Sequence, residues 1–205
     1  MNKSHCIEFF FDCSSPWTYL AFAEILPLSQ RQNIDIIWRP VLVGGIFNSV
    51  NQDVYEFRKN PNPLKIKYSN SDLSLWAKVR DLNISMPKVF PVNSVKAMRG
   101  CLFADTKNNL PVFAKKVFDA YWGQGLDISE DSVLIKIAES AELSLDEFLK
   151  YISSQDAKDL LINNSEDLIS RGGFGSPTFY YQGHMFFGND RLHLLEEVIA
   201  HNLTN

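Results

Sequence analysis

Apolar and aromatic residues form a short run near the start of the chain, between polar neighbours. The run from Ile7 to Asp12 is rich in Phe and ends at a carboxylate, which is typical of a buried strand. A helical pattern follows from Trp17 to Gln32, with Ser15-Pro16 suited to the N-cap and the first helical position. A second alternating run, Ile34 to Arg39, predicts another strand, which a right-handed crossover places parallel to the first. The start of the chain therefore predicts a βαβ unit.

The middle of the chain, residues 51–170, changes to helical patterns with few β-branched runs. Its first part is polar and contains several prolines, which favours a loop. Further on, Ser144 with Glu147 three residues later has the spacing of a capping box. We expect an all-helical insertion here. The predicted helices are Asp72 to Asn83, Ser94 to Asn108, Leu110 to Trp122, Ser129 to Ala141, Leu145 to Ser153 and Asp156 to Arg171.

Two aromatic-rich runs close to the C-terminus have the pattern of a hairpin. Thr178 to Tyr181 and Met185 to Phe187 are separated by Gln182-Gly183-His184, and a last helix is expected from Asp190. The order βαβ, helices, ββα is that of an α/β thioredoxin-like fold interrupted by an all-α domain. We assign residues 1–50 and 171–205 to the thioredoxin-like domain and residues 51–170 to the helical insertion.

Composition limits the classes of partner. The chain has 205 residues, of which 45% are hydrophobic, enough for one sizeable core. Its 20 basic and 24 acidic residues give a net charge of -4 and no polybasic face, so we expect neither nucleic acid nor membrane as a partner. Cys6, Cys13 and Cys101 are odd in number, without disulfide or zinc spacing, and the four His show no metal pattern. We therefore expect a reduced, cytoplasmic protein without a metal.

The turn after the first strand carries the first candidate chemistry, in the sequence Asp12-Cys13-Ser14-Ser15-Pro16-Trp17-Thr18. An ordinary helix N-terminus accounts for Ser15 alone, but such a terminus also stabilises a thiolate. The turn resembles that of 2-hydroxychromene-2-carboxylate isomerases and kappa-class glutathione transferases, whereas disulfide oxidoreductases of the same fold carry Cys-Pro-x-Cys. Because hydroxyl residues stand in place of both cysteines, disulfide exchange is unavailable at this turn. The resemblance implies that Ser15 is catalytic and holds the sulfur of glutathione.

Two later motifs extend the resemblance. It implies that Ser176-Pro177 is cis, although only about 5% of X–Pro bonds generally are, and that Ser176 then pairs with the cysteinyl backbone of glutathione. The alternative is a plain proline at a strand entry. In Gly188-Asn189-Asp190-Arg191 a turn and N-cap suffice as an explanation. There the resemblance implies that Asn189 and Asp190 bind the γ-glutamyl end, with Asp190 facing its ammonium group.

Weaker matches lie between these motifs. Lys65, in a Lys-x-x-Tyr element, meets glutathione in the resembling families, although a lysine in a polar loop is usually only solvated. The resemblance also implies a homodimer in which Asp72 of one subunit can reach its neighbour's glutathione. The chain departs from the family pattern at Asn60-Pro61-Asn62-Pro63, and Trp38 to Phe47 matches a structural loop near the site. The segment from Phe90 to Ser94 matches a helix start that capping explains.

The resemblance covers nearly the whole chain and implies a homodimeric, glutathione-dependent enzyme acting on a small aromatic substrate. Two chemistries remain open. An isomerase adds the sulfur reversibly to a 2-hydroxychromene-2-carboxylate-like compound of aromatic catabolism, whereas a transferase leaves it attached to an electrophile. We favour the isomerase, because the Ser15 turn and the Gly-Asn-Asp-Arg motif are closer to that branch. A glutathione-binding protein without turnover is the rival from another class.

Overall fold

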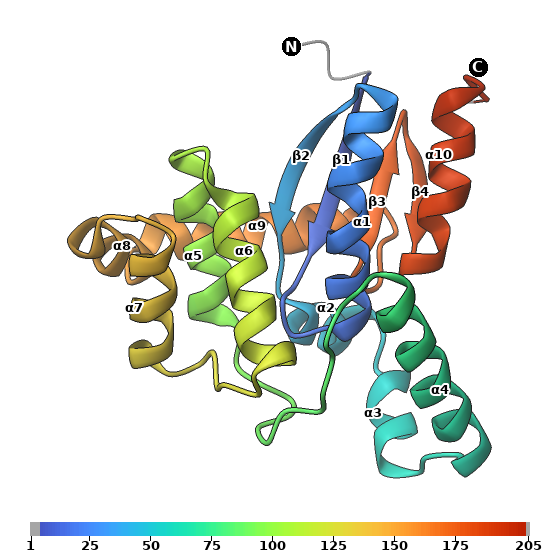
Figure 1. The fold of residues 1–205 in the computed structure, drawn as a ribbon, viewed down its shortest axis with the longest axis horizontal. Helices are drawn as coiled ribbons and strands as arrows, with labels where there is room; N and C mark the ends of the chain where they lie inside the picture. Colours follow the sequence, from blue (N-terminus) through green and yellow to red (C-terminus); the bar gives the residue numbers. More distant parts are fainter. Residues whose placement is uncertain (1–4, 204–205) are drawn as a thin grey trace.

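A mixed four-stranded sheet forms the centre of the computed structural model, which describes residues 5–203. Its strands are β1 (Cys6–Phe11), β2 (Asp35–Pro40), β3 (Thr178–Tyr181) and β4 (His184–Phe187), in the order β2-β1-β3-β4. As predicted, β1 and β2 are parallel, and β3 and β4 form an antiparallel hairpin (Figure 1). The central strand β1 also pairs antiparallel with β3. The thioredoxin-like arrangement expected from the sequence is confirmed.

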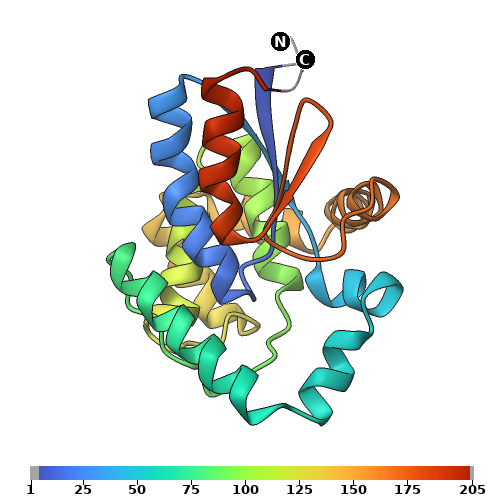
Figure 2. The ribbon, with the colours of Figure 1, turned by 90° about the vertical axis from the view of Figure 1, so that its right-hand side faces the viewer.

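Helices cover both faces of this sheet, and β1 carries buried phenylalanines toward each of them. α1 (Pro16–Gln32) and α10 (Leu192–Ala200) lie on one face, and α9 (Gln155–Ser170) lies on the other (Figure 2). Phe9 belongs to the large core on the α1 side, whereas Phe10 packs in a smaller cluster with Leu168 of α9. Successive strand residues point to opposite faces, so Phe9 and Phe10 pack into the cores on opposite sides of the sheet.

The remaining helices form two groups. The group beside β2, α5 to α8, shares one hydrophobic core with the sheet. In the other group, α2 packs against the sheet through Ile46, while α3 and α4 extend away from it (Figure 1). These helices are α2 (Val43–Val50), α3 (Asp53–Lys59), α4 (Pro63–Val79), α5 (Val95–Thr106), α6 (Leu110–Phe118), α7 (Asp131–Ser140) and α8 (Leu145–Ile152). None of the helices within residues 5–203 combines the length and hydrophobicity that a bilayer crossing requires.

The segment after β2 corrects the sequence-based expectation. Where a loop was expected, α2 and α3 form, and α4 begins at Pro63 instead of Asp72. The side chain of Asn62 accepts hydrogen bonds from the amides of Leu64 and Lys65, so Asn62-Pro63 is an N-cap followed by a first-turn proline. That signal was present in the sequence and was read only as a departure from the family pattern.

Two further boundaries and one cap differ from the prediction. The helix expected to reach Trp122 ends at Phe118 and continues as a π-helical turn over Asp119–Gly123. The last helix is preceded by a 3-10 turn, Asn189–Arg191, instead of starting directly at Asp190. Ser144 is at the N-cap of α8, but its side chain forms no capping hydrogen bond, so the predicted capping box is wrong there.

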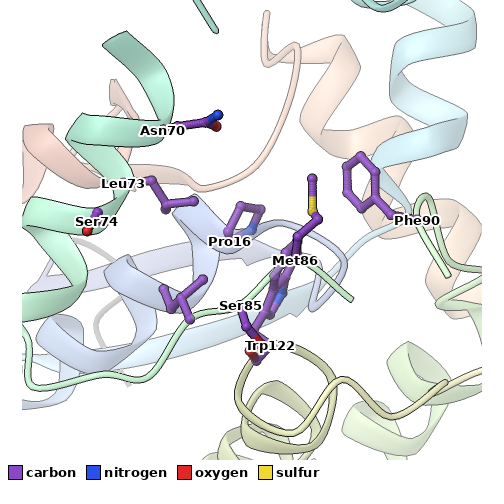
Figure 3. Close-up of a pocket in the computed structure, with 9 residues that line it drawn as sticks. Pro16, Asn70, Leu73, Ser74, Ser85, Met86, Phe90 and Trp122 are labelled. Carbon is purple, nitrogen blue, oxygen red and sulfur yellow. Dashed lines mark hydrogen bonds between the residues drawn. The ribbon is translucent and has the colours of Figure 1, made fainter. Parts of the chain in front are cut away.

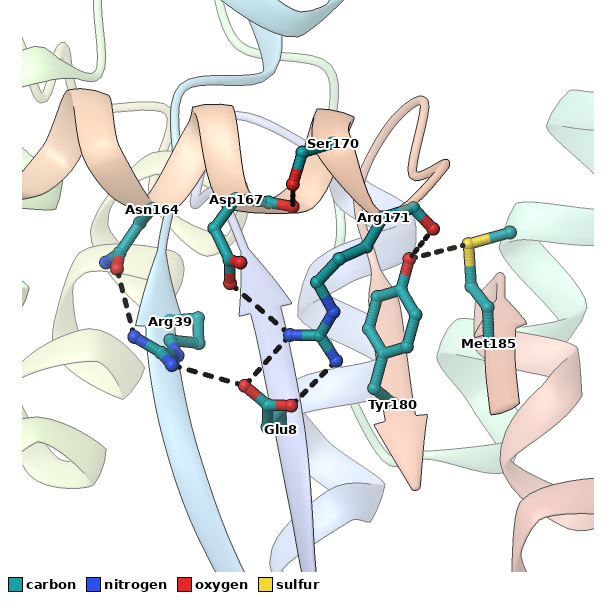
Figure 4. Close-up of polar contacts among 8 residues, drawn as sticks. All are labelled: Glu8, Arg39, Asn164, Asp167, Ser170, Arg171, Tyr180 and Met185. Atoms are coloured by element: carbon teal, nitrogen blue, oxygen red, sulfur yellow. Dashed lines mark hydrogen bonds and ion pairs between the residues drawn. The ribbon is translucent and has the colours of Figure 1, made fainter. Parts of the chain in front are cut away.

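A charged cluster ties the end of α9 to the sheet (Figure 4). Glu8 of β1 receives hydrogen bonds of 2.7 and 3.1 Å from Arg171 and one of 3.2 Å from Arg39. The guanidinium of Arg171 lies 3.8 Å from the ring centroid of Tyr180, whose hydroxyl donates to the Arg171 carbonyl at 2.8 Å. The start of the loop that leads to β3 is therefore fixed to β1.

Glu8 makes the stability of this cluster depend on pH. Burial alone would raise the pKa of Glu8, but hydrogen bonds and charge from Arg171 and Arg39 outweigh it and lower that pKa below its ordinary 4.5. A lowered folded-state pKa contributes stability that is present above the unfolded value and is lost as pH falls through the folded one. We expect Glu8→Gln to cost more free energy of unfolding at pH 7 than near pH 3, measured by urea denaturation.

A matched control for this prediction is Glu56→Gln, which removes an exposed carboxylate paired with Lys59. Its effect should be small at both pH values, because exposed ion pairs contribute little. An equal cost of Glu8→Gln at both pH values would contradict the assignment of this pH dependence to Glu8.

Candidate functional site

Ser15 lies at the N-cap of α1, where β1 turns into the helix. Its hydroxyl oxygen accepts a hydrogen bond from the Thr18 amide at 3.3 Å, and Pro16 occupies the first turn. The Ser15 amide donates to the Asp12 carbonyl at 3.2 Å, which tightens the turn. The predicted N-cap is confirmed, and the Ser15 hydroxyl lies at the positive end of the helix dipole.

The buried carboxylate of Asp12 holds this turn in place through hydrogen bonds. Its side chain is 1% exposed and accepts hydrogen bonds from the amides of Ser14 and Val43, each at 2.9 Å, and from the Ser94 hydroxyl at 3.1 Å. Burial raises the pKa of Asp12, and these hydrogen bonds oppose that rise. Asp12 thus joins the Ser15 turn to the starts of α2 and α5. Of the two residues expected to cap this helix, Asn93 accepts a hydrogen bond from the Val95 amide at 3.1 Å, whereas the Ser94 hydroxyl bonds to Asp12 and makes no cap.

The second motif, Ser176-Pro177, contacts this turn, although Ser176 lies 161 residues after Ser15 in the sequence. Ser176-Pro177 is cis, as expected. The Ser176 hydroxyl lies 2.8 Å from the Thr18 hydroxyl and accepts from the Asp12 amide at 3.1 Å, while the Ser176 carbonyl lies 3.5 Å from the Ser15 hydroxyl. The structure therefore brings Ser15, Ser176 and Pro177 together.

The third motif, Gly188 to Arg191, lies next to Pro177 in space. The Gly188 amide donates to the Pro177 carbonyl at 3.0 Å, which brings the turn of Asn189 and Asp190 next to the cis-proline. Gly188 has φ +108, and a Cβ there would lie 2.6 Å from an Asp190 carboxylate oxygen, so this turn requires glycine. Asn189 is buried, and its side-chain oxygen has no hydrogen-bond partner among residues 5–203. Asp190 is exposed, 3.6 Å from Arg191.

Lys65 and Asp72 both lie on α4, which contacts α1. Lys65 is exposed in the first turn of α4, and Asp72 is partly exposed near its middle. Within the described part of the chain, no hydrogen bond or ion pair joins either side chain to Ser15, Ser176 or Asp190. The roles assigned to these two residues remain predictions.

A cavity of about 310 Å³ opens beside the N-terminus of α1 (Figure 3). Residues of α4 lie on one side of it, with Met86 and Phe90 of the following loop opposite. Trp122 contributes an indole whose N–H donates to the Cys13 carbonyl at 2.9 Å, so the cavity wall is tied to the Ser15 turn. The lining residues are Pro16, Asn70, Leu73, Ser74, Ile84, Ser85, Met86, Phe90 and Trp122. Pro16 and Phe90 belong to motifs named from the sequence. The other lining residues carry no local signal, because the apolar ones share the pattern of a core and the polar ones that of a solvated surface.

The cysteines nearest the turn are unsuited to redox chemistry. Cys13 and Cys101 are buried free thiols. Burial, together with the neighbouring Cys101 thiol, raises the pKa of Cys13 well above its ordinary value. Since the thiolate is the reactive form, the chemistry available at the turn comes from the Ser15 hydroxyl and from the helix N-terminus, because Thr18 is buried and its hydroxyl is paired with Ser176. These groups can hold an anion such as a bound sulfur.

Comparison with known proteins agrees with this geometry. A family model described as a DSBA-like thioredoxin domain matches residues 6–200. The chain is 26% identical to a 2-hydroxychromene-2-carboxylate isomerase of Sphingobium xenophagum, covering 94% of this chain and 97% of the relative. It is 27% identical to human glutathione S-transferase kappa 1, covering 95% and 90%. A solved 2-hydroxychromene-2-carboxylate isomerase superposes with a TM-score of 0.82 at 24% identity, covering 97% of this chain and 96% of that one, which shows a shared fold. The chain therefore belongs to the DSBA-like thioredoxin domain family and, within it, to the group of 2-hydroxychromene-2-carboxylate isomerases and kappa-class glutathione transferases.

Proposed function

We propose that the protein is a glutathione-dependent enzyme in which the Ser15 hydroxyl donates a hydrogen bond to the glutathione thiolate. The observation that carries this proposal is the position of Ser15 at the N-cap of α1, facing the cis-proline loop. Its contact with the Ser176 carbonyl, at 3.5 Å, is long for a hydroxyl hydrogen bond. The proton can therefore turn to a bound sulfur at little cost, while the helix dipole favours the thiolate.

The rest of glutathione would be bound by the two other motifs and by α4. The Ser176 backbone would pair with the cysteinyl residue, as an added strand would. The γ-glutamyl end carries an ammonium and a carboxylate. The ammonium suits Asp190 and the side-chain oxygen of Asn189, which has no partner among residues 5–203, and the carboxylate suits the turn before α10. The glycyl carboxylate would then point toward Lys65. Pro177 holds the loop between the sulfur and the γ-glutamyl site.

The chemistry follows from the thiolate. Its lone pair forms a C–S bond with an electrophilic carbon of a small aromatic-derived substrate, and the electron pair of the attacked bond moves to a conjugated oxygen. In an isomerase a bond then rotates, the electrons return, and the thiolate leaves unchanged. We favour this outcome, on a 2-hydroxychromene-2-carboxylate-like substrate, and a homodimer in the cytoplasm with Asp72 near the neighbouring site. In a transferase the C–S bond persists, as the name of the human kappa relative describes.

Calorimetric titration with glutathione, beside turnover assays on 2-hydroxychromene-2-carboxylate and on chlorodinitrobenzene, tests the proposal. We expect glutathione binding together with isomerisation. Conjugation of chlorodinitrobenzene without isomerisation would favour the transferase. Binding without either reaction would favour a glutathione-binding protein that has no turnover, and absence of glutathione binding would contradict the proposal.

Removing the protein charges that face the two ends of glutathione should weaken binding without changing the pKa of the bound thiol. We expect Asp190→Ala and Lys65→Ala each to cost about 1.5 to 3 kcal/mol of binding free energy, the range for charge-assisted hydrogen bonds, toward its lower end because both side chains are exposed. Calorimetry measures the affinity, and a pH titration of thiolate absorbance measures the pKa of the bound thiol.

Lys67→Ala is the matched control, because Lys67 is an equally exposed lysine on the same helix. Its affinity for glutathione should be close to that of the wild type. A loss of affinity in Lys67→Ala as large as that in Lys65→Ala would remove the specific role of Lys65. A large rise of the thiol pKa in Asp190→Ala would contradict the separation of the two ends from the sulfur.

A further inference from the structure

The cavity beside Pro16 is uncharged throughout. Its polar lining consists of the side chains of Asn70, Ser74 and Ser85, and the indole N–H of Trp122 is already bonded to the Cys13 carbonyl. Burying a carboxylate against such a wall is costly, because no cation replaces its water. A flat uncharged ring fits the cavity, so an anionic substituent on that ring must point outward to the mouth.

A cation is available at the mouth. Arg58, in the last turn of α3, has its guanidinium carbon 5.5 Å from the ring centroid of Phe90 and 6.0 Å from that of Tyr55. Phe90 lines the cavity and is 40% exposed, so one ring contacts both the cavity and the cation. This stacking holds the guanidinium beside the opening.

Arg58 forms no ion pair with a carboxylate in the part of the chain that the structure describes. Its neighbour Lys59 pairs with Glu56 at 3.0 Å, whereas no ion pair of Arg58 exists among residues 5–203. A planar guanidinium held against aromatic rings is suited to bidentate binding of a carboxylate. The Arg58 side chain is exposed and does not contribute to the packing of the core.

We propose that Arg58 binds a carboxylate carried by the acceptor substrate while the ring of that substrate lies in the cavity against Phe90 and Trp122. Arg58 is then a specificity-determining residue, which selects aryl carboxylates over uncharged acceptors and does not touch the reacting atoms. The reaction used to test it rests on the proposed glutathione chemistry, whereas the binding claim does not depend on it.

The test compares two acceptors of similar size, the anionic 4-chloro-3,5-dinitrobenzoate and its neutral amide, and follows how Arg58 variants change the ratio of their rates. In both, the glutathione sulfur forms a C–S bond at the ring carbon, chloride leaves with the electrons of the C–Cl bond, and the thiol proton goes to solvent. We expect Arg58→Gln to lower kcat/KM about tenfold for the benzoate and less than about twofold for the amide, as the loss of a charge-assisted contact implies. Arg58→Lys should retain part of the preference, and Lys59→Gln should leave both values unchanged.

The ratio of the two kcat/KM values is the decisive readout, because a purely structural loss lowers both equally. An unchanged ratio in Arg58→Gln would overturn the proposal. If no conjugation occurs, binding of the two compounds is followed by quenching of the intrinsic tryptophan fluorescence, to which Trp122 in the cavity wall contributes. Equal affinity of the benzoate for wild type and Arg58→Gln would then overturn the proposal as well. Failure to bind glutathione in calorimetry would contradict the proposed function alone, since the fluorescence titration needs no glutathione.

Discussion

Replacement of Ser15 by Ala is expected to lower kcat by roughly 100- to 1,000-fold, the range for removing one hydrogen-bond donor from a reacting anion. The sulfur of bound glutathione would lose the hydroxyl at the N-cap of α1, and less of it would be ionised at neutral pH. The fold should persist, because loss of an N-cap costs only about 0.5 to 2 kcal/mol of stability. Steady-state kinetics with saturating glutathione, beside thermal unfolding, measures both effects.

Ser14→Ala is the control for this variant. Ser14 is the adjacent residue of the same turn. Its amide bonds to Asp12 at 2.9 Å and remains in the variant, which loses only the weaker interaction of the Ser14 hydroxyl with that carboxylate. Its turnover should be close to that of the wild type. Unchanged kcat in Ser15→Ala would remove Ser15 from the mechanism, and equal losses in both variants would indicate damage to the turn as a whole.

The second large effect concerns stability and is expected from Asp12→Ala. The buried carboxylate accepts hydrogen bonds from the amides of Ser14 and Val43 and from the Ser94 hydroxyl. Removing it leaves three donors in a buried site without an acceptor, and each such donor costs about 1 to 3 kcal/mol. We expect the free energy of unfolding to fall by at least about 3 kcal/mol, a large part of the stability of a typical domain. Urea denaturation measures the change.

Ser94→Ala separates the role of the carboxylate from that of one of its partners. It removes a single donor and leaves both amide hydrogen bonds of Asp12 in place, so it should cost about 1 kcal/mol. If Asp12→Ala costs no more than Ser94→Ala, Asp12 does not hold the three segments together.

The sequence predicted those parts of the fold whose signal is local. The Phe-rich β1, the cap at Ser15-Pro16 and the hairpin of β3 and β4 each follow from neighbouring residues, and all are present. The segment after β2 was missed because α2 contains two glycines and is held in place by tertiary contacts. The amide of Val43 bonds to Asp12, and Ile46 is buried in the smaller cluster on the α9 face. Tertiary contacts of this kind override weak helix propensity.

The site was predictable where a motif carried the chemistry. Ser15, Ser176 and the turn of Asn189 could be named from the sequence, and the structure brings their segments together. The cavity and Arg58 could not, because their meaning depends on which side chains face one another across α4, α3 and the loop that carries Phe90. Likewise, Ser94 has the sequence signature of a cap, and only its distance to Asp12 reveals its part in the turn.

The pKa of the glutathione thiol in the complex tests the central claim most directly. A free cysteine thiol has a pKa of about 8.5. With glutathione bound to the wild-type protein, a titration of thiolate absorbance should give a lower pKa, and Ser15→Ala should raise it again while affinity changes little. A bound thiol that titrates like free glutathione, or that titrates identically in wild type and Ser15→Ala, would contradict the account.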